Sequence, residues 1–319
     1  MRFCFLILHY NNIELTTKAV NSIRSLDKAV GQGDLELENE TDIVIVDNGS
    51  PNNSGIVIKQ LYENTPGIHV ILTGENGGFA KGNNAGFKYI KEKLCSPPKG
   101  AVDFVIDLNN DITFPQKDFL KRLTEVYEKS EPKFHVAGPD VYTPHIRSHI
   151  SPLYKCVRGR NEAKAAIEVL EKINEQFRHG VSFKNYTRYL QEKYQGTWLL
   201  KAYNRLRKHE YDGACAHNEV LYNCVLNGAC LIFDKRFIEE NDILFEEKTF
   251  LYVEEDFLTK RMLNAGKVTR YSPELIVDHV GQGSSGFSKM NYKSYVAKNI
   301  ATNERCIEAW KIYENTCGS

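Results

Sequence analysis

The sequence predicts an α/β fold with a mostly parallel central sheet that is flanked by helices and carries a helical insertion. Three observations lead to this prediction. In the N-terminal part of the chain, short apolar segments alternate with segments of helical periodicity. The run DIVIVD at 42–47 is almost continuously apolar, as expected of a parallel strand buried on both faces. Near Pro144 this alternation gives way to helical composition, and it returns after Asn227.

Each element has its own signal in the sequence. An apolar run predicts a first strand at 3–8, and a helix at 13–26 is indicated by the helical spacing of Leu15, Ala19, Ile23 and Leu26. A helix at 79–94 follows a Gly/Asn-rich turn, and one at 115–128 has proline in its first turn. A further helix is expected at 56–62, and further strands are expected at 68–72 and 104–107. The C-terminal part predicts strands at 229–233, 268–271 and 275–278, and helices at 255–264 and 292–313.

Composition excludes several classes of protein. The 319 residues include 42% hydrophobic and 26% charged residues, an ordinary globular balance. Forty-one basic and 41 acidic residues give no net charge, so the chain as a whole is not a polycation built for nucleic acid. No apolar run has the length of a membrane span. The eight cysteines form no C-x-x-C pair, which is typical of reduced thiols in a cytoplasmic protein.

Two polar motifs follow predicted strands in the N-terminal part. In VDNGS (46–50), Asp47 ends a strand, where its carboxylate can accept a hydrogen bond from a nucleobase or ribose. In ENGGFAKGNNAG (75–86), the glycines allow a close approach of the backbone to a ligand, and the loop opens a helix that can bind an anion. Turn formation alone also explains the first motif, and the second matches neither the P-loop nor the dinucleotide fingerprint.

Three further motifs carry candidate chemistry. DLNNDI (107–112) closes a strand, and Asp111 with Asn109 beside it can bind a hard cation, Mg²⁺ or Mn²⁺; a polar turn explains the same residues. Glu254, Glu255 and Asp256 begin a predicted helix, where the dipole favours acids, but where a carboxylate among carboxylates also suits a general base. His279 ends a strand beside a glycine loop whose G-x-G-x-x-G lacks the context of a dinucleotide site, and its imidazole suits a metal or diphosphate.

Taken in order, these motifs resemble glycosyltransferase family 2, whose members are inverting enzymes of the GT-A fold. The motifs are LHYNN, VDNGS, N-x-G-F-A-x-G-N-N-x-G, LNND, the NGA segment before a strand, EED and H-x-G-x-G-S. The resemblance covers about 1–142 and 227–299. It is strongest to the rhamnosyltransferase-like members of bacterial surface polysaccharide synthesis. It implies a GT-A fold and transfer of a sugar, for example rhamnose, from a nucleoside-diphosphate donor (a dTDP- or UDP-sugar) to a glycan or polyprenyl-linked acceptor.

The resemblance also implies roles for individual residues. Nucleobase and ribose are expected at His9, Tyr10, Asn11 and Asp47. The donor cleft is expected to be lined by Asn76, Gly78, Lys81 and Asn83. Asn109, Asn110 and Asp111 stand at the D-x-D metal motif, so that Asp111 and His279 are expected to bind Mg²⁺ or Mn²⁺. The asparagine at the first position removes one charged ligand. Asp256 matches the base that activates the acceptor hydroxyl, with Glu255 as its partner.

The resemblance divides the chain into three parts. Residues 1–145 form the nucleotide-sugar-binding half of the GT-A domain, 146–226 a mainly helical insertion, and 227–319 the acceptor-binding half with a C-terminal helix. Within the insertion, 155–210 holds 13 Lys/Arg and 6 Asp/Glu with interleaved Tyr and Trp. A solvated basic helix pair explains this composition. We also hypothesise that the segment selects the acceptor and docks on anionic lipid, placing a cytoplasmic protein at the inner face of the membrane.

Two alternatives to a transferase stay open on the sequence. A sugar-nucleotide-binding protein without catalysis would use the same donor residues. A nucleotidylyltransferase would share an α/β nucleotide cleft, but it would need a Gly-rich, Arg-bearing phosphate loop directly after the first strand, where this chain has LHYNN. A carbohydrate-binding module leaves Asp256 with its two acidic neighbours unexplained.

Overall fold

The fold is described from a computed structural model that covers residues 1–27, 40–95, 100–144, 147–180, 183–193, 217–280 and 290–316. Part of the basic segment (194–210) and the glycine loop 281–286 lie outside these described residues. The chain divides into two compact units. Unit 1 comprises Met1–Val157, Asp212–Phe250 and Glu254–Gly283, and unit 2 comprises Arg158–Tyr211, Leu251–Val253 and Ser284–Ser319. Every predicted site residue falls in unit 1.

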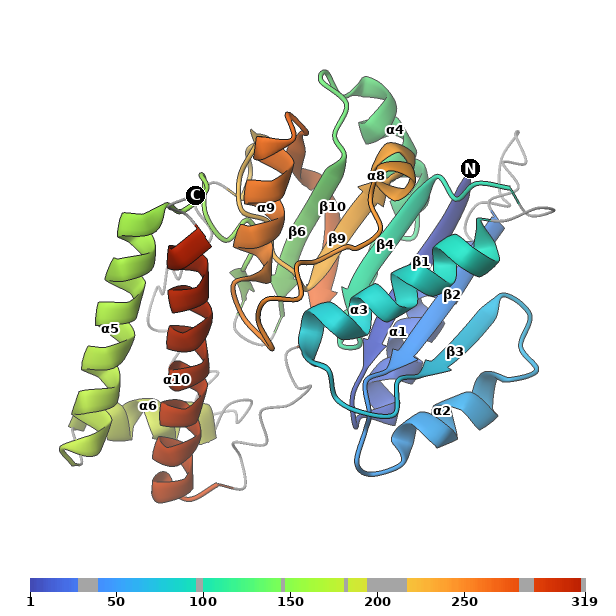
Figure 1. Cartoon of the computed structure of the whole chain (residues 1–319). Helices are drawn as coiled ribbons and strands as arrows, with labels where there is room; N and C mark the ends of the chain where they lie inside the picture. Colours follow the sequence, from blue (N-terminus) through green and yellow to red (C-terminus); the bar gives the residue numbers. More distant parts are fainter. Residues whose placement is uncertain are drawn as a thin grey trace. The chain divides into compact units, whose positions relative to one another are not determined.

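Unit 1 is built on one large sheet (Figure 1). Across the sheet the strands run in the order β3 (Ile68–Leu72), β2 (Glu40–Asp47), β1 (Arg2–His9), β4 (Phe104–Asn109), β9 (Cys230–Asp234), β6 (Val136–Thr143), β10 (Thr269–His279) and β5 (Ile112–Thr113). The short strands β7 (Ser148–His149) and β8 (Leu221–Tyr222) pair with β6 and β10.

The sheet has a parallel half and a mixed half. Strands β3, β2, β1 and β4 are parallel, as are β6 and β10, while β9 runs antiparallel between β4 and β6. This confirms the predicted α/β fold class and makes the sheet as a whole mixed. The four parallel strands leave their carboxyl ends at one edge, which is where α/β sheets bind ligands.

Helices cover both faces of the sheet because its central strands are apolar on both sides. In β1, Phe3, Phe5 and Ile7 join one core and Cys4 and Leu6 the other. The first core is closed by helices α1 (Ile13–Asp27), α2 (Ser54–Tyr62) and α4 (Phe119–Lys129). The second is closed by α3 (Gly78–Tyr89), its π-helical continuation η1 (Ile90–Leu94), α8 (Lys235–Glu240) and α9 (Glu254–Asn264).

The structure differs from the predicted elements in a few places. Strand β6 was not expected from the sequence; it is buried and contains Gly138 and Pro139, residue types that are depleted in strands. The two strands predicted at 268–271 and 275–278 form one strand, β10, whose register to β6 shifts between Ser272 and Ile276. Such an irregularity interrupts the alternation of side chains and so hides the continuity of the strand.

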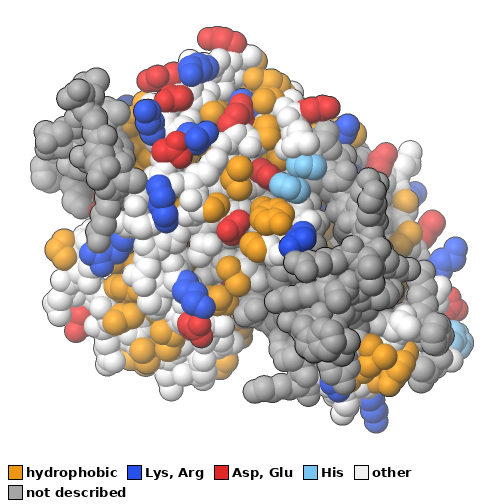
Figure 2. Space-filling view, turned by 180° about the vertical axis from the view of Figure 1, so that it is seen from behind, with side chains coloured by type: hydrophobic (Ala, Val, Ile, Leu, Met, Phe, Trp, Pro, Cys, Tyr) orange, Lys and Arg blue, Asp and Glu red, His pale blue; other side chains and the backbone are white. Residues whose placement is uncertain are grey.

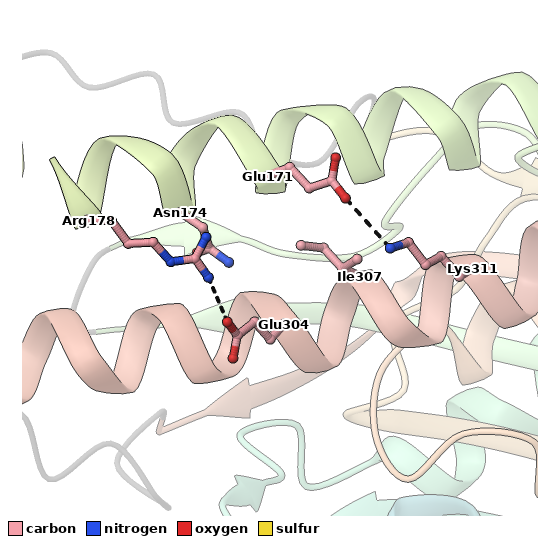
Figure 3. A pocket seen from close by; sticks show the side chains of 6 residues that line it. All are labelled: Glu171, Asn174, Arg178, Glu304, Ile307 and Lys311. Atoms are coloured by element: carbon pink, nitrogen blue, oxygen red, sulfur yellow. Dashed lines mark hydrogen bonds and ion pairs between the residues drawn. The ribbon is translucent and has the colours of Figure 1, made fainter.

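Unit 2 contains α5 (Arg160–Arg178), α6 (Phe183–Lys193) and α10 (Tyr292–Thr316). Helices α5 and α10 pack along each other, and a pocket of about 240 Å³ opens between them, as Figure 3 shows. Its walls carry the ion pairs Arg178–Glu304 (2.7 Å) and Glu171–Lys311 (3.6 Å). Within the described ranges, no helix has the length and apolar character that crossing a bilayer requires.

Candidate active site

The predicted site residues gather where adjacent parallel strands end. His9, Asp47 and Asn109 are the last residues of β1, β2 and β4, and the register places His9 beside Asp47 and Leu8 beside Asn109. Figure 1 shows these strands ending at the lower edge of the sheet, and α9 beginning toward the same edge. The fold therefore brings together residues that lie about a hundred positions apart in sequence.

The His9 side chain is fully buried and both of its ring nitrogens are engaged. Nδ1 lies 2.6 Å from Oγ1 of Thr16, and Nε2 lies 2.9 Å from Oγ of Ser54. The Thr16 hydroxyl donates to the Asn12 carbonyl, so His9 donates from Nδ1 and accepts from Ser54 at Nε2. Burial lowers the pKa of His9, and the nearby Asp47 carboxylate partly opposes this effect. A neutral His9 thus fixes the start of α1 and the loop after β1.

Next to His9, two residues of the loop after β1 are suited to contact a ligand. Tyr10 is 37% exposed. Asn11 adopts a left-handed backbone conformation (φ 64°), with its N–H donating to Oγ of Ser50. Its Oδ1 is buried and has no hydrogen-bond partner among the described residues. A buried acceptor without a partner costs free energy, and a bound ligand would supply the missing donor.

Asp47 is buried at the end of β2. One carboxylate oxygen, Oδ2, accepts from the backbone N–H of Ser50 (3.3 Å). The other, Oδ1, is buried without a hydrogen bond in the described part of the chain and lies 3.9 Å from Nε2 of His9. On the other side, a Cβ at Gly55 of α2 would overlap the Asp47 carboxyl group. The close approach of α2 therefore fixes Asp47 with one acceptor oxygen unused.

The loop before α3 depends on Asn48, a residue that the sequence analysis treated only as part of a turn. Asn48 Oδ1 accepts from the N–H of Gly77, and its Nδ2 donates to Oδ1 of Asn76 and to the carbonyl of Gly78. Asn76 itself is exposed. Gly78 has φ 88°, and its close contact with the Phe250 carbonyl leaves no room for a Cβ. Asn48 and Gly78 together hold the predicted donor loop.

On α3, the neighbouring residues Asn83 and Asn84 have different environments. Asn84 makes four hydrogen bonds: its Oδ1 accepts from the N–H groups of Leu244 and Phe245, and its Nδ2 donates to the Phe245 carbonyl and to Oε1 of Glu247. Asn83 is 1% exposed, and neither its oxygen nor its nitrogen has a partner within the described ranges. Asn84 therefore ties α3 to the segment before α9, and Asn83 keeps a buried amide available. Lys81 is exposed on the same helix.

The turn after β4 brings together the two predicted metal ligands. Oδ2 of Asp111 lies 3.3 Å from Nε2 of His279. Antiparallel pairing of β5 with β10 places Ile112 opposite His279, and the Val280 N–H donates to the Asp111 carbonyl. Within the same turn, Asn110 donates through Nδ2 to Oγ1 of Thr16 (3.1 Å), the hydroxyl that also binds His9. The sequence gives no signal for the role of Thr16, since a threonine in a helix carries no distinctive pattern.

The residues of this turn fit a divalent cation that is completed by substrate. A carboxylate, an imidazole and nearby amide oxygens are acceptable ligands for Mn²⁺, and Mg²⁺ is commonly held by one or two carboxylates plus phosphate oxygens. In the described part of the chain, no cluster of three or more His, Cys, Asp or Glu side chains could hold a metal ion on its own. The donor set of Asp111 and His279 therefore suits a cation shared with a diphosphate.

The acidic cluster forms the first turn of α9. Asp256 is fully buried, and Glu254 is 3% exposed. Just before it, Tyr252 and Val253 both have positive φ (80° and 72°), which is strained for a β-branched residue and is often seen at functional sites. Glu255 accepts at Oε1 from the N–H of Gly228 (3.1 Å).

Two backbone contacts connect the acidic cluster to the turn after β4. Gly228 binds Glu255, and the carbonyl of the next residue, Ala229, accepts from the N–H of Asn109 (3.0 Å). The start of α9 and the end of β4 therefore meet at the start of β9. This supports the prediction that Asp111 and Asp256 serve one site.

Asp107 lies two residues before Asn109 on β4. It is buried, and within the described residues neither of its carboxylate oxygens accepts a hydrogen bond. Burial raises its pKa well above the usual range of a carboxylic acid. Val105 on the same strand and Leu6 opposite Asp107 belong to the core that α3 and α9 close, so Asp107 faces that layer. It is a carboxyl group inside the core next to the site, and its burial favours the protonated form.

A family model described as glycosyl transferase family 2 matches residues 4–183. The chain belongs to this family. The match confirms the predicted family, which is a family of glycosyltransferases. An uncharacterized glycosyltransferase of Nostoc sp. (strain PCC 7120) is 30% identical over 131 residues, which are 41% of this chain and 34% of that protein. The chain thus aligns with about a third of the length of that relative.

The structure of S. aureus TarS 1–349 in complex with UDP-GlcNAc shows the same fold at low sequence identity. It has a TM-score of 0.50 and 14% identity, covering 97% of this chain and 71% of that chain. Mannosyltransferase PcManGT from Pyrobaculum calidifontis, in complex with GDP-Man and Mn²⁺, has a TM-score of 0.48 and 12% identity over 98% of this chain and 69% of that chain. The predicted GT-A fold is confirmed, whereas the rhamnosyltransferase-like subgroup and the roles of individual residues stay predictions.

Proposed function

We propose that this family 2 chain transfers a sugar from a nucleoside-diphosphate donor to a hydroxyl group of a glycan or polyprenyl-linked acceptor, with inversion at the anomeric carbon. The observation that carries the proposal is the meeting of the Asn109–Asp111 turn and the start of α9 at residues 228–229. These contacts support a site in which the turn with Asp111 binds the metal and diphosphate and the start of α9 supplies the proton acceptor, both on elements of one unit. Positioning two substrates between such groups accounts for a large share of a transferase's rate.

The nucleoside binds at the ends of β1 and β2. Asp47 Oδ1 and Asn11 Oδ1 are buried acceptors without partners among the described residues, so N–H or O–H groups of a base and a ribose satisfy them. Tyr10 is exposed beside them and covers the base. Both ring nitrogens of His9 are engaged by Thr16 and Ser54, so its role is to fix this loop. UDP and dTDP are the nucleotides that we expect.

The donor sugar and diphosphate lie along α3 and the turn after β4. Asn83 supplies a buried amide, while Asn76, Gly78 and Lys81 line the approach to it. Asn109 and Asn110 shape the turn, and Asp111 and His279 would hold Mg²⁺ or Mn²⁺. When bound, the cation neutralises negative charge that develops on the leaving nucleoside diphosphate.

Asp256 accepts the proton of the attacking hydroxyl. It is buried at the start of α9, and Glu255, bound to the Gly228 N–H, fixes that first turn. The hydroxyl oxygen attacks the anomeric carbon as its proton passes to the carboxylate, and the bond to the diphosphate breaks on the opposite face, which inverts the configuration. Hydrogen-bond donors that already point at the reacting groups need no reorganisation during this step.

Finer features of the reaction belong to the proposal as well. Rhamnose as the donor sugar and surface polysaccharide as the product follow from the motif pattern. The three-part division at 145 and 226 and metal dependence have the same basis. A cytoplasmic location is proposed from the cysteine pattern, and docking on the membrane from the basic, aromatic-rich composition of 155–210. Helices α5 and α6 lie in the range 146–226, and α5 packs against α10 within unit 2, which supports a helical accessory part.

The test is substitution of the proposed base, Asp256→Asn, with Asp242→Asn as a matched control. The Asp242 side chain is 98% exposed, so its amide should have no effect. Release of nucleoside diphosphate from UDP-, dTDP- and GDP-sugars is measured with a panel of glycan and polyprenyl-linked acceptors, with and without Mn²⁺. We expect Asp256→Asn to lower kcat by roughly 10²–10⁴-fold while UDP binding is kept.

Other outcomes separate the alternatives. Nucleotide binding without turnover of any sugar by the wild-type protein would favour the non-catalytic binder. Release of pyrophosphate from a nucleoside triphosphate and a sugar phosphate would identify a nucleotidylyltransferase. Equal turnover by the wild type and Asp256→Asn would contradict the assignment of the base.

A further inference from the structure

A second group of titratable side chains lies in unit 1, in the carboxyl-terminal half of β6. Asp140 of β6 is buried, and its two carboxylate oxygens lie 2.9 and 2.7 Å from Nδ1 of His149 on β7. Antiparallel pairing of β6 with β7 sets Tyr142 directly opposite His149. None of these residues is part of the site described above.

The rings of Tyr142, His149 and His217 lie next to one another in this order. The imidazoles of His149 and His217 are stacked, with centroids 4.0 Å apart and planes 11° apart, and the Tyr142 ring lies 5.0 Å from that of His149. The Tyr271 hydroxyl donates to the His217 carbonyl (2.8 Å). The His149 side chain is 32% exposed. Figure 2 shows histidine side chains at the surface of the molecule. The hydrogen bonds to Asp140 and from Tyr271 thus fix the rings on their buried side, and His149 is partly open to solvent.

The hydrogen bond to Asp140 decides what His149 can bind. The carboxylate accepts only, so Nδ1 of His149 carries the proton and the lone pair of Nε2 is available as an acceptor. Among the described residues, Nε2 of His149 has no hydrogen-bond partner. It is therefore suited to accept a hydrogen bond from a hydroxyl group.

The same arrangement disfavours an anionic ligand. A buried carboxylate lies directly behind His149, and two imidazolium ions stacked at 4.0 Å would repel each other. A phosphate bound to this ring would also be repelled by the negative charge of the Asp140 carboxylate. A sugar ring offers what the group requires, since its C–H face packs against flat rings and its hydroxyls donate hydrogen bonds.

The group is also connected to the proposed base by a short series of contacts. The carbonyl of Ile150, the residue after His149, accepts from Nδ2 of Asn227 (2.7 Å). Gly228, which follows Asn227, donates its N–H to Glu255 in the first turn of α9. In addition, the Tyr271 ring belongs to the core that α9 closes through Leu258 and Met262. The rings therefore lie on the α9 side of the sheet, near the end that carries Asp256.

We propose that Tyr142, His149 and His217 form an acceptor subsite for a neutral pyranose, with a sugar hydroxyl donating to Nε2 of His149. The inference rests on the proposed function and assigns the acceptor end of that site to a carbohydrate ring. Asp140 is a positioning residue, because it sets the tautomer of His149 and touches no substrate itself.

The experiment records histidine side-chain ¹⁵N spectra of the full chain, with signals assigned from His149→Gln and His217→Gln. The probes are methyl glycosides of rhamnose, glucose, galactose and N-acetylglucosamine, and inorganic phosphate as the anionic alternative. We expect at least one glycoside to shift the His149 and His217 signals. The control is His69, whose Nε2 lies 3.2 Å from Asp42 at the other end of the strand order and whose signals should not move.

The variant Asp140→Asn separates binding from structure. Its amide can donate to Nδ1, which moves the proton to Nε2, so we expect the ¹⁵N spectrum to report the other tautomer and glycoside affinity to fall about tenfold, the equivalent of one hydrogen bond. In turnover assays the acceptor KM should rise while the donor KM is unchanged. His69→Gln should change neither.

The inference is overturned if no glycoside shifts His149 and His217, if phosphate shifts them in place of glycosides, or if Asp140→Asn and His149→Gln bind glycosides as the wild type does. Glycoside binding at these rings without any turnover of nucleotide sugars would contradict the proposed function and leave the subsite standing. Turnover that depends on Asp256 but not on His149 would contradict the subsite and leave the proposed function standing.

Discussion

Substituting Gly78 by alanine tests the close packing that holds the donor loop. Gly78 opens α3 with φ 88°, its neighbour Phe79 donates to the Phe250 carbonyl (3.0 Å), and a Cβ at Gly78 would overlap that oxygen and come within 3.0 Å of Phe250 Cα. Gly74 offers a matched control. It has almost the same backbone angle, φ 84°, but a Cβ there would meet nothing within 4 Å.

The expected magnitudes follow from this comparison. A left-handed conformation costs an alanine about 1–2 kcal/mol, and this cost applies to both variants. Only Gly78→Ala also loses the Phe79–Phe250 hydrogen bond, at about 0.5–1.5 kcal/mol, and gains overpacking of about 1–3 kcal/mol. We therefore expect Gly78→Ala to lower the free energy of unfolding by about 2–4 kcal/mol more than Gly74→Ala, or roughly 4–8 °C in Tm.

Thermal unfolding and UDP titration check both parts of this reasoning. Gly78→Ala should also weaken UDP binding, since it separates segment 244–250 from the loop that Asn48 holds, while Gly74→Ala should bind UDP as the wild type does. Equal losses of stability in the two variants would show that the backbone angle alone matters. The close approach of Phe250 to α3 would then have no role in the site.

Two further predictions follow from buried polar groups. Asn84→Ala should lower the free energy of unfolding by about 2–4 kcal/mol because it leaves several buried partners unpaired. Asn83→Ala should change the free energy of unfolding little and weaken donor binding about tenfold. Thermal unfolding and UDP-sugar titration of both variants check these expectations. Burial raises the pKa of Asp107 in the folded state, so stability from its protonated form is full below about pH 4 and is lost as pH rises toward the folded pKa. In urea unfolding, Asp107→Asn should therefore gain stability over wild type at pH 7 but not at pH 4. A difference that is constant with pH would contradict a raised pKa of Asp107.

Local patterns were sufficient to predict most of the parallel half of the sheet. Strands β1 to β4 carry apolar residues on both faces and alternate with helices of clear periodicity, so each element carries its own signal. Strand β6 could not be found in this way, because Gly138 and Pro139 stand in it. Pairing with β9 and β10, which lie far along the chain, stabilises it. Tertiary packing overrides local propensity there.

The site shows the same division between local and distant information. The polar ends of β1, β2 and β4 could be predicted from sequence, because strand ends are local features. Neither Thr16 nor Asn48 could be assigned, since their roles depend on partners in other segments, such as Asn110 for Thr16. Asn83 and Asn84 are identical in type and adjacent, and only the packing of α3 decides which of them is satisfied internally.

The N-G-A segment before β9 has a physical reason for each of its residues. Asn227 accepts from the Ala229 N–H and donates to the Ile150 carbonyl, so its side chain fixes the turn. A Cβ at Gly228 would lie 2.6 Å from Oε1 of Glu255, so only glycine lets its N–H reach that carboxylate. Ala229 then accepts from Asn109. A three-residue segment without any reactive group thereby sets the spacing between the turn that carries Asp111 and the helix that carries Asp256, and changes there should alter catalysis through geometry alone.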